Sequence, residues 1–284
     1  MSAEALIRAG QVEAALAALL DEVRAAPADA GKRVFLFQLQ SVLGNWSKAL
    51  AQLGVAAELE ASKVLLAQIY RPALEAEAFR AEVFAGRRSP MVLGEPPAWM
   101  GMLIQALAHD AAGASAAAAA LRDGAFEQAE PSGGSIATAS PDGEPASHRF
   151  EWLADADPRL GPVFELMLQG KYYWAPMERV RSIRFEAPEA LRDMIWAQAV
   201  VTWRNGGAAS ALVPVRYAGT ESSDNDRLRL ARATEWEEAD GAVRGLGQRE
   251  LATDAGEFAL LGVRAIEFDP SEDDSAGGEG ASGG

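Results

Sequence analysis

Cysteine is absent from the chain of 284 residues. A disulfide framework, a thiolate-bound zinc or iron–sulfur centre and a cysteine nucleophile are therefore excluded. Histidine occurs only twice, as His109 and His148, so one chain cannot supply a three-histidine zinc site. A long apolar run is also missing, because the longest stretch, residues 111–121, is mostly alanine and much shorter than a membrane span.

Basic residues are scarce relative to acidic ones. Lysine and arginine number 26 against 41 aspartates and glutamates, which gives a formal net charge of −15. This charge repels polyanions, so we expect neither nucleic acid nor an anionic membrane as a partner. Glu4 and Arg8 interrupt the region where a signal peptide needs an apolar core. The sequence therefore predicts a soluble, cytoplasmic protein without membrane insertion.

Residues 1–130 have the pattern of a helical repeat domain. Alanine is abundant, and Gly10 and Gly44 each begin a similar segment 34 residues apart, with a third copy at Gly113. A 34-residue period with glycine at the turn and small residues at helix crossings is typical of tetratricopeptide-like helix pairs. An irregular helical bundle is the alternative, because residues 86–97 break the period.

The second half has a different pattern. Residues 131–147 are rich in proline, glycine and serine and are predicted to be a linker. Residues 148–268 contain short aromatic and β-branched runs, including 171–176, 180–186, 197–204 and 211–217. They predict a mainly antiparallel β domain, resembling a partly closed barrel, with one or two short helices. Residues 269–284 form an acidic, glycine-rich tail that we expect to be disordered.

Closely spaced carboxylates that could act together in a metal site or in acid–base catalysis are few. Asp155 and Asp157 lie two residues apart and could act on a small ligand together with Arg159 or Arg192. The simpler interpretation is an Asx-type turn, because Pro158 follows directly. No glycine-rich phosphate loop or cofactor motif is evident, so we expect no metal, no cofactor and no enzymatic activity.

Aromatic residues indicate where partners could bind. Tyr172 and Trp174 share one face of a predicted strand and Tyr173 lies on the other. In the helical half, stacked helix pairs form a concave groove that can hold a peptide or a helix. The candidates for its lining are Phe35, Phe37, Gln38 and Trp46.

Several segments, in order, resemble the ImpE family, also called TagJ, of accessory proteins of bacterial type VI secretion systems. They are residues 34–39, 83–88, 93–96, 152–163, 170–176 (Gly-Lys-Tyr-Tyr-Trp-Ala-Pro), 191–193, 215–221, 230–236, 245–249 and 253–257. The resemblance covers roughly residues 1–268. The motif residues to which we assign no role are Asp155, Asp157, Arg159, Tyr172, Tyr173, Trp174, Arg192, Asp193, Arg216 and Tyr217.

The resemblance implies a helical repeat domain followed by a β-rich domain, in a non-enzymatic accessory protein. It further implies binding to the N-terminal helical region of the small subunit of the contractile sheath, and thereby a link to the AAA+ unfoldase that disassembles sheaths. It implies no catalytic residues and leaves the oligomeric state open. Two alternatives stay open: a general peptide-binding scaffold or chaperone, and a small-ligand enzyme built on Asp155 and Asp157.

Overall fold

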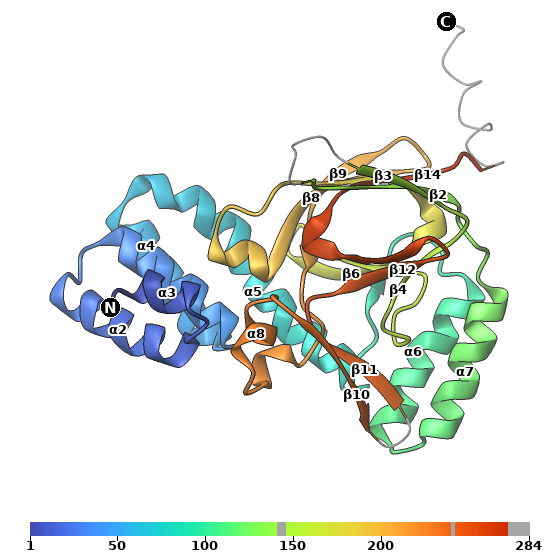
Figure 1. Ribbon diagram of the computed structural model, residues 1–284, viewed down its shortest axis with the longest axis horizontal. Coiled ribbons are helices and arrows are strands. Elements are labelled where there is room, and N and C mark those ends of the chain that lie inside the picture. Colours follow the sequence, from blue (N-terminus) through green and yellow to red (C-terminus); the bar gives the residue numbers. More distant parts are fainter. Residues whose placement is uncertain (141–145, 240–241, 272–284) are drawn as a thin grey trace, which may run out of the picture.

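The computed structural model describes residues 1–140, 146–239 and 242–271; helices α2 to α4 gather at one end of the molecule, and α6 and α7 lie at the other end beside the strands (Figure 1). The helices are α1 (Ala3–Arg8), α2 (Val12–Ala25), α3 (Ala30–Val42), α4 (Trp46–Leu59), α5 (Val64–Phe84), α6 (Ala98–Ala111), α7 (Ser115–Gln128) and α8 (Asp226–Arg229). The strands are β1 (Met91–Val92), β2 (Gly134–Thr138), β3 (Ala146–Phe150), β4 (Leu153–Asp155), β5 (Val163–Leu168), β6 (Lys171–Pro176), β7 (Val180–Phe185), β8 (Trp196–Trp203), β9 (Ala208–Pro214), β10 (Thr234–Ala239), β11 (Ala242–Gly247), β12 (Glu250–Thr253), β13 (Gly256–Ala259) and β14 (Val263–Phe268).

Glycines end the first helix of each helix hairpin. Gly10, Gly44 and Gly113 lie between α1 and α2, α3 and α4, and α6 and α7, with φ angles of 72°, 68° and 73°. Glycine reaches this left-handed region without strain. After α1, the Gln11 N–H donates to the carbonyl of Leu6 at 2.9 Å, which closes a Schellman motif. The helical N-terminal half is therefore confirmed, whereas its assignment to the tetratricopeptide class stays a prediction.

The largest sheet has nine strands in the order β1-β6-β5-β9-β8-β7-β14-β2-β3. Only the pairing of β1 with β6 is parallel among the described strands of this sheet. A three-stranded sheet, β13-β12-β4, and the hairpin β10-β11 complete the β-rich half. In the described part of the chain, β1 and β3 are the two edges of the large sheet. A partly closed barrel is thus not confirmed.

Strands lie inside the segment that was predicted to be a linker. Strand β2 occupies residues 134–138 and pairs with β14, where Ile136 faces Ile266 and is fully buried. The linker prediction is wrong there, because the glycine-rich composition serves close packing. A Cβ on Gly134 would lie 2.3 Å from the carbonyl oxygen of Glu267. Residues 141–145 of the predicted linker, and residues 272–284 of the predicted tail, lie outside the described residues.

Two apolar cores lie on the two faces of the large sheet. Phe164 and Leu166 of β5 join the core that contains Leu251 of β12. On the other face, Tyr172 and Trp174 of β6 join the core of the helices. The predicted alternation of Tyr172, Tyr173 and Trp174 is confirmed, since Tyr173 packs on the opposite side. The helical half and the sheet therefore share one continuous core.

Candidate functional site

Aromatic rings join α3, α4 and α5 to the sheet. The ring of Tyr70 on α5 lies 5.9 Å from that of Phe37 and 5.7 Å from that of Trp196. Trp46, at the start of α4, lies 6.2 Å from Trp196. These centroid separations are in the range of favourable aromatic pairs.

Two of the four residues predicted to line a groove are buried inside the protein. Phe37 is fully buried, and Gln38 is 7% exposed and accepts the backbone N–H of Arg192 at 3.0 Å. Neither can meet a partner without disrupting these contacts, so for Phe37 and Gln38 the prediction of an open groove is corrected. Phe35 and Trp46 are half-buried against the core of the helices.

A buried ionic cluster lies where α5 crosses the sheet. Arg80 donates from Nε and Nη2 to the two carboxylate oxygens of Glu165, at 2.6 and 3.0 Å. Its Nη1 lies 3.5 Å from Oε2 of Glu77, one helical turn earlier. Tyr172 donates to Glu165 at 2.5 Å, and the Trp174 indole donates to the Tyr172 hydroxyl at 2.7 Å. Such bidentate, charge-assisted bonds fix the distance and the angle between helix and strand.

The pKa values in this cluster follow the balance between burial and pairing. Burial opposes the charge of Glu165, but Arg80 and Arg249 outweigh it and lower the pKa of the carboxyl group. Glu77 differs, because burial dominates and raises its pKa, although the indole of Trp196 donates to it at 2.8 Å. Glu165 is therefore the charged centre of the cluster.

Arg249 extends the cluster to the three-stranded sheet. It donates from Nε and Nη2 to Oδ2 of Asp155, at 2.8 and 2.6 Å, and its Nη1 lies 3.1 Å from Glu165. Burial raises the pKa of Asp155 to about 6. The other oxygen of Asp155 accepts the N–H of Asp157 at 2.9 Å, so both of its oxygens are bonded within the chain.

Arg216 connects the cluster to the ends of two helices. Its Nη1 donates to the carbonyls of Val42 and Arg229, at 2.8 and 2.6 Å, where α3 and α8 end. Helix C-termini present unsatisfied carbonyls that favour a cation. Its own carbonyl accepts from Arg80 at 2.9 Å. Burial lowers the pKa of Arg216 to about 10.

Asp157 forms the predicted Asx-type turn and also supports a neighbouring hairpin. Its carboxylate accepts the N–H and the guanidinium of Arg159, the latter at 2.6 Å from Nη2, and the N–H of Gly245 at 2.9 Å. The ring of Tyr217 covers Gly245, where a Cβ would lie 2.4 Å from that ring. Asp155 and Asp157 are thus adjacent, as predicted, but each holds its own arginine.

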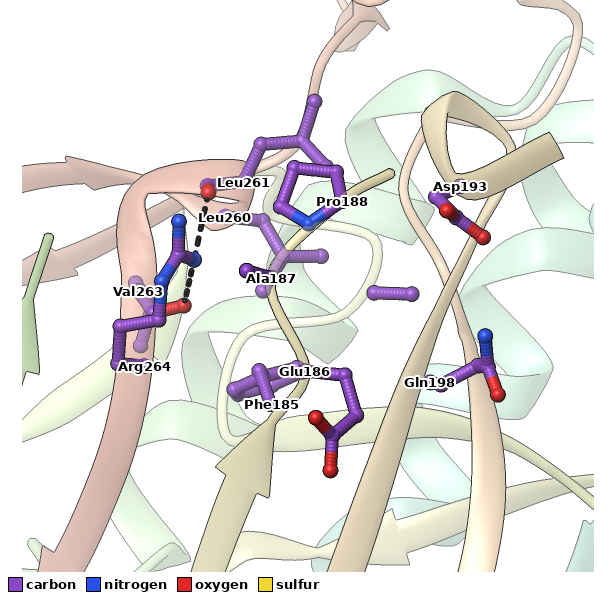
Figure 2. Close-up of a pocket in the computed structure, with 11 residues that line it drawn as sticks. Phe185, Glu186, Ala187, Pro188, Asp193, Gln198, Leu260, Leu261, Val263 and Arg264 are labelled. Carbon is purple, nitrogen blue, oxygen red and sulfur yellow. Dashed lines mark hydrogen bonds between the residues drawn. The ribbon is translucent and has the colours of Figure 1, made fainter. Parts of the chain in front are cut away.

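Arg192 joins the sheet to the helices, and Asp193 closes a local turn beside a very small cleft. Arg192 donates to the hydroxyl of Tyr70 at 3.1 Å, and Asp193 accepts the N–H of Ala190 at 2.8 Å. Figure 2 shows Asp193 at one side of this cleft and Arg264, bonded to the backbone, at the other. The cleft holds about 10 Å³, which is room for one water molecule.

A much larger cavity opens between the end of α7 and strand β4. Its volume is about 600 Å³, and its lining includes Trp99, Phe126, Trp152 and Met177. This volume is in the range of ligand pockets. Asp155 also borders the cavity, but both of its carboxylate oxygens are bonded within the chain. No local pattern in the sequence indicates the cavity, because its walls come from segments far apart in the chain.

Metal ligands do not gather within the described ranges, where no three histidine, aspartate or glutamate side chains form a group that could hold an ion. Over the same residues, no helix has both the length and the apolar character needed to cross a bilayer. The residues that sequence reasoning missed are Glu77, Arg80, Glu165 and Arg249. Glu77 and Arg80 look like an ordinary surface ion pair on a helix, and only the fold brings them to Glu165.

These features define a class of two-part protein in which an α-helical half packs on a mixed β-sheet and a buried ionic cluster joins the two. A family model described as "ImpE protein" matches residues 147–267. The "Type VI secretion system accessory component TagJ" of Pseudomonas aeruginosa is 47% identical over 272 residues, which are 96% of this chain and 92% of that protein. The chain belongs to the ImpE family.

A solved structure has the same fold. The X-ray crystal structure of protein VPA1032 from Vibrio parahaemolyticus matches with a TM-score of 0.83 and covers 95% of this chain and 98% of that one. The two sequences are 21% identical, so this likeness shows the fold alone. The helical half and the sheet therefore occur together in a second protein.

Proposed function

We propose that this chain is a non-enzymatic accessory component of a type VI secretion system, acting as an adaptor in the cytoplasm. It binds the N-terminal helical region of the sheath small subunit and thereby connects contracted sheaths to the AAA+ unfoldase that recycles them. The observation that carries the proposal is the 47% identity, over 96% of the chain, to an accessory component named TagJ. Binding of the sheath subunit rests on the family resemblance.

We place the contact on exposed apolar residues of the helical half. Leu65 and Ile69 are 64% and 43% exposed and lie four residues apart, so they share one face of α5. Leu59 and Val64, 42% and 41% exposed, flank the short turn that leads into this helix. Large apolar side chains that stay exposed together commonly mark protein-binding surfaces.

The size and charge of the surface fit an amphipathic helix. A helix laid on this face would bury about 600–800 Å² on each partner. The net charge of −15 favours a basic partner segment and raises its association rate, with a matching dependence on salt. Phe37 and Gln38, which are buried inside the protein, do not touch the partner in this arrangement.

The two alternatives have less support. An enzyme built on Asp155 and Asp157 needs a free carboxylate oxygen, whereas the oxygens of both groups are bonded to neighbouring arginines or backbone N–H groups. A general scaffold or chaperone shares the helical surface and differs only in its partner. A binding titration with a defined partner separates it from the adaptor.

The test is calorimetry with a synthetic peptide of the N-terminal helical region of the cognate sheath small subunit. An adaptor should give a saturable one-to-one heat that weakens as salt is raised. The double variant Leu65→Ser/Ile69→Ser removes two apolar anchors, so its affinity for the peptide should be at least about tenfold lower than that of the parent. Point variants are preferable to removal of residues 1–130, since both halves share a core.

A matched control makes the same kind of substitution, an exposed apolar residue to serine, away from the proposed docking face. Val200 and Val243 are each 43% exposed and lie in the β-rich half. The variant Val200→Ser/Val243→Ser should bind the peptide like the parent. Equal weakening by both double variants would refute the docking face, and absence of heat with the parent would refute sheath binding itself.

A further inference from the structure

The cavity between α7 and β4 is built from large apolar side chains on a rigid base. Trp99 of α6 and Met177 are 4% and 1% exposed and form its floor, whereas Phe126 of α7 and Trp152 are 38% and 40% exposed at its mouth. Aromatic residues and methionine are enriched at protein-binding sites. The cavity holds about 600 Å³, enough for several side chains of a bound segment.

The position of the mouth is fixed by close packing. Gly161, with a φ angle of 53°, approaches Phe126 so closely that a Cβ would lie 2.3 Å from the ring. The Phe126 ring therefore cannot move further toward Gly161. Trp152, which is 40% exposed, also lines the mouth.

Acidic side chains line the cavity. They are Glu127, Glu130, Glu178 and Asp155, of which Glu178 lies 3.9 Å from Arg179 and Asp155 is bonded to Arg249. Glu127 and Glu130 are exposed, and neither forms an ion pair with a residue that the structure describes. An apolar floor under an acidic rim complements a segment that carries large apolar side chains between lysines or arginines.

We propose that this cavity is a second protein-binding site, which takes a basic segment of a partner protein and buries its apolar anchors against Trp99, Phe126 and Trp152. In Figure 1, α7 lies at the opposite end of the molecule from the turn between α4 and α5. The chain would thus hold two partners at once. The inference does not depend on sheath binding.

The test uses a probe peptide, acetyl-Lys-Lys-Leu-Phe-Leu-Lys-Lys-amide, and the full chain with ¹⁵N-labelled tryptophan. The indole signals of Trp152 and Trp99, assigned through Trp152→Phe and Trp99→Phe, should shift and saturate on titration. A peptide with glutamates in place of the lysines should not shift them. A peptide with serines in place of the three apolar residues should bind with an affinity at least about tenfold lower.

Two variants of the protein test the shape and the charge of the site separately. Ala154 lines the cavity and pairs with Ala252 on β12, so Ala154→Phe fills it without a charge change. Glu127→Lys/Glu130→Lys reverses the charge of the two exposed acidic side chains at the rim. Each of these two variants should lower the affinity for the probe peptide by about tenfold or more. Glu58→Lys/Glu75→Lys, at exposed helical positions on α4 and α5, changes the net charge by the same amount and should bind like the parent.

The outcomes are distinguishable. An unshifted Trp152 signal with the basic probe overturns the proposal, as does equal binding by the parent and the filled or charge-reversed variant. Equal binding of the serine peptide means that charge alone attracts the probe, which also overturns it. If Ala154→Phe lowers the urea midpoint, Phe126→Ala at the exposed mouth replaces it, with Trp99 as the reporter.

Discussion

Arg80 is the residue whose removal tests the buried cluster most severely. It is 4% exposed and pairs with Glu165, which is fully buried, through two hydrogen bonds of 2.6 and 3.0 Å. In Arg80→Met, the Glu165 carboxylate loses its bidentate partner and keeps Arg249 and Tyr172. Breaking one partner of a buried ion pair costs about 3–5 kcal/mol. We expect the free energy of unfolding, measured in urea by tryptophan fluorescence, to fall by that amount.

A control lies at the end of the same helix. Arg87 binds Glu82 through two hydrogen bonds of 2.8 and 2.7 Å, but the two side chains are 61% and 40% exposed. Arg87→Met should therefore cost about 1 kcal/mol or less. The geometry of the two pairs is alike, so the difference between the variants isolates the effect of burial.

The double variant Arg80→Met/Glu165→Gln completes the cycle. The glutamine side chain in place of Glu165 carries no charge, and Arg249 keeps Asp155 as its partner at 2.6 Å. We expect the double variant to be about 2 kcal/mol more stable than the sum of the single changes implies. A loss below about 1 kcal/mol in Arg80→Met, equal to that of Arg87→Met, would refute the view that this cluster locks the two halves together.

Three further outcomes follow from neighbouring residues. Because burial raises the folded pKa of Asp155 from 3.8 to about 6, its contribution to stability is present below pH 3.8 and lost as the pH rises through about 6. Relative to Asp155→Asn, the parent should lose about 3 kcal/mol between about pH 3.5 and about pH 7 in urea titrations, and a flat difference would contradict this. Arg216→Met leaves the carbonyls at the ends of α3 and α8 without their donor, so hydrogen exchange should quicken in the last turn of α3, and unchanged exchange would count against the link. Gly44→Ala meets both a φ of 68° and the Cγ atom of Glu221 at 2.6 Å, so it should lower the free energy of unfolding by about 1 kcal/mol or more, whereas Gly94→Ala, with open space around it, should cost less.

Local signals in the sequence predicted the local structure well. The glycines at 10, 44 and 113 mark helix ends because the left-handed conformation is a property of the single residue. The alternation of Tyr172, Tyr173 and Trp174 predicted the correct faces of β6, because the period of a strand is fixed by its geometry.

Long-range features escaped prediction for a physical reason. Arg80 and Glu165 are 85 residues apart, and nothing in either local pattern indicates that both become buried. The glycine-rich segment before β3 misled for the opposite reason, since Gly134 serves a close contact between strands rather than freedom of the chain. Open surfaces were misjudged similarly, because Phe37 is covered by neighbouring side chains and is fully buried.

The most direct measurement is a calorimetric titration of the parent chain with the sheath small subunit, intact and lacking its N-terminal helical region. We expect a saturable one-to-one heat with the intact subunit and no heat with the shortened one. Equal heat from both, or no heat from the intact subunit, would contradict the proposed adaptor.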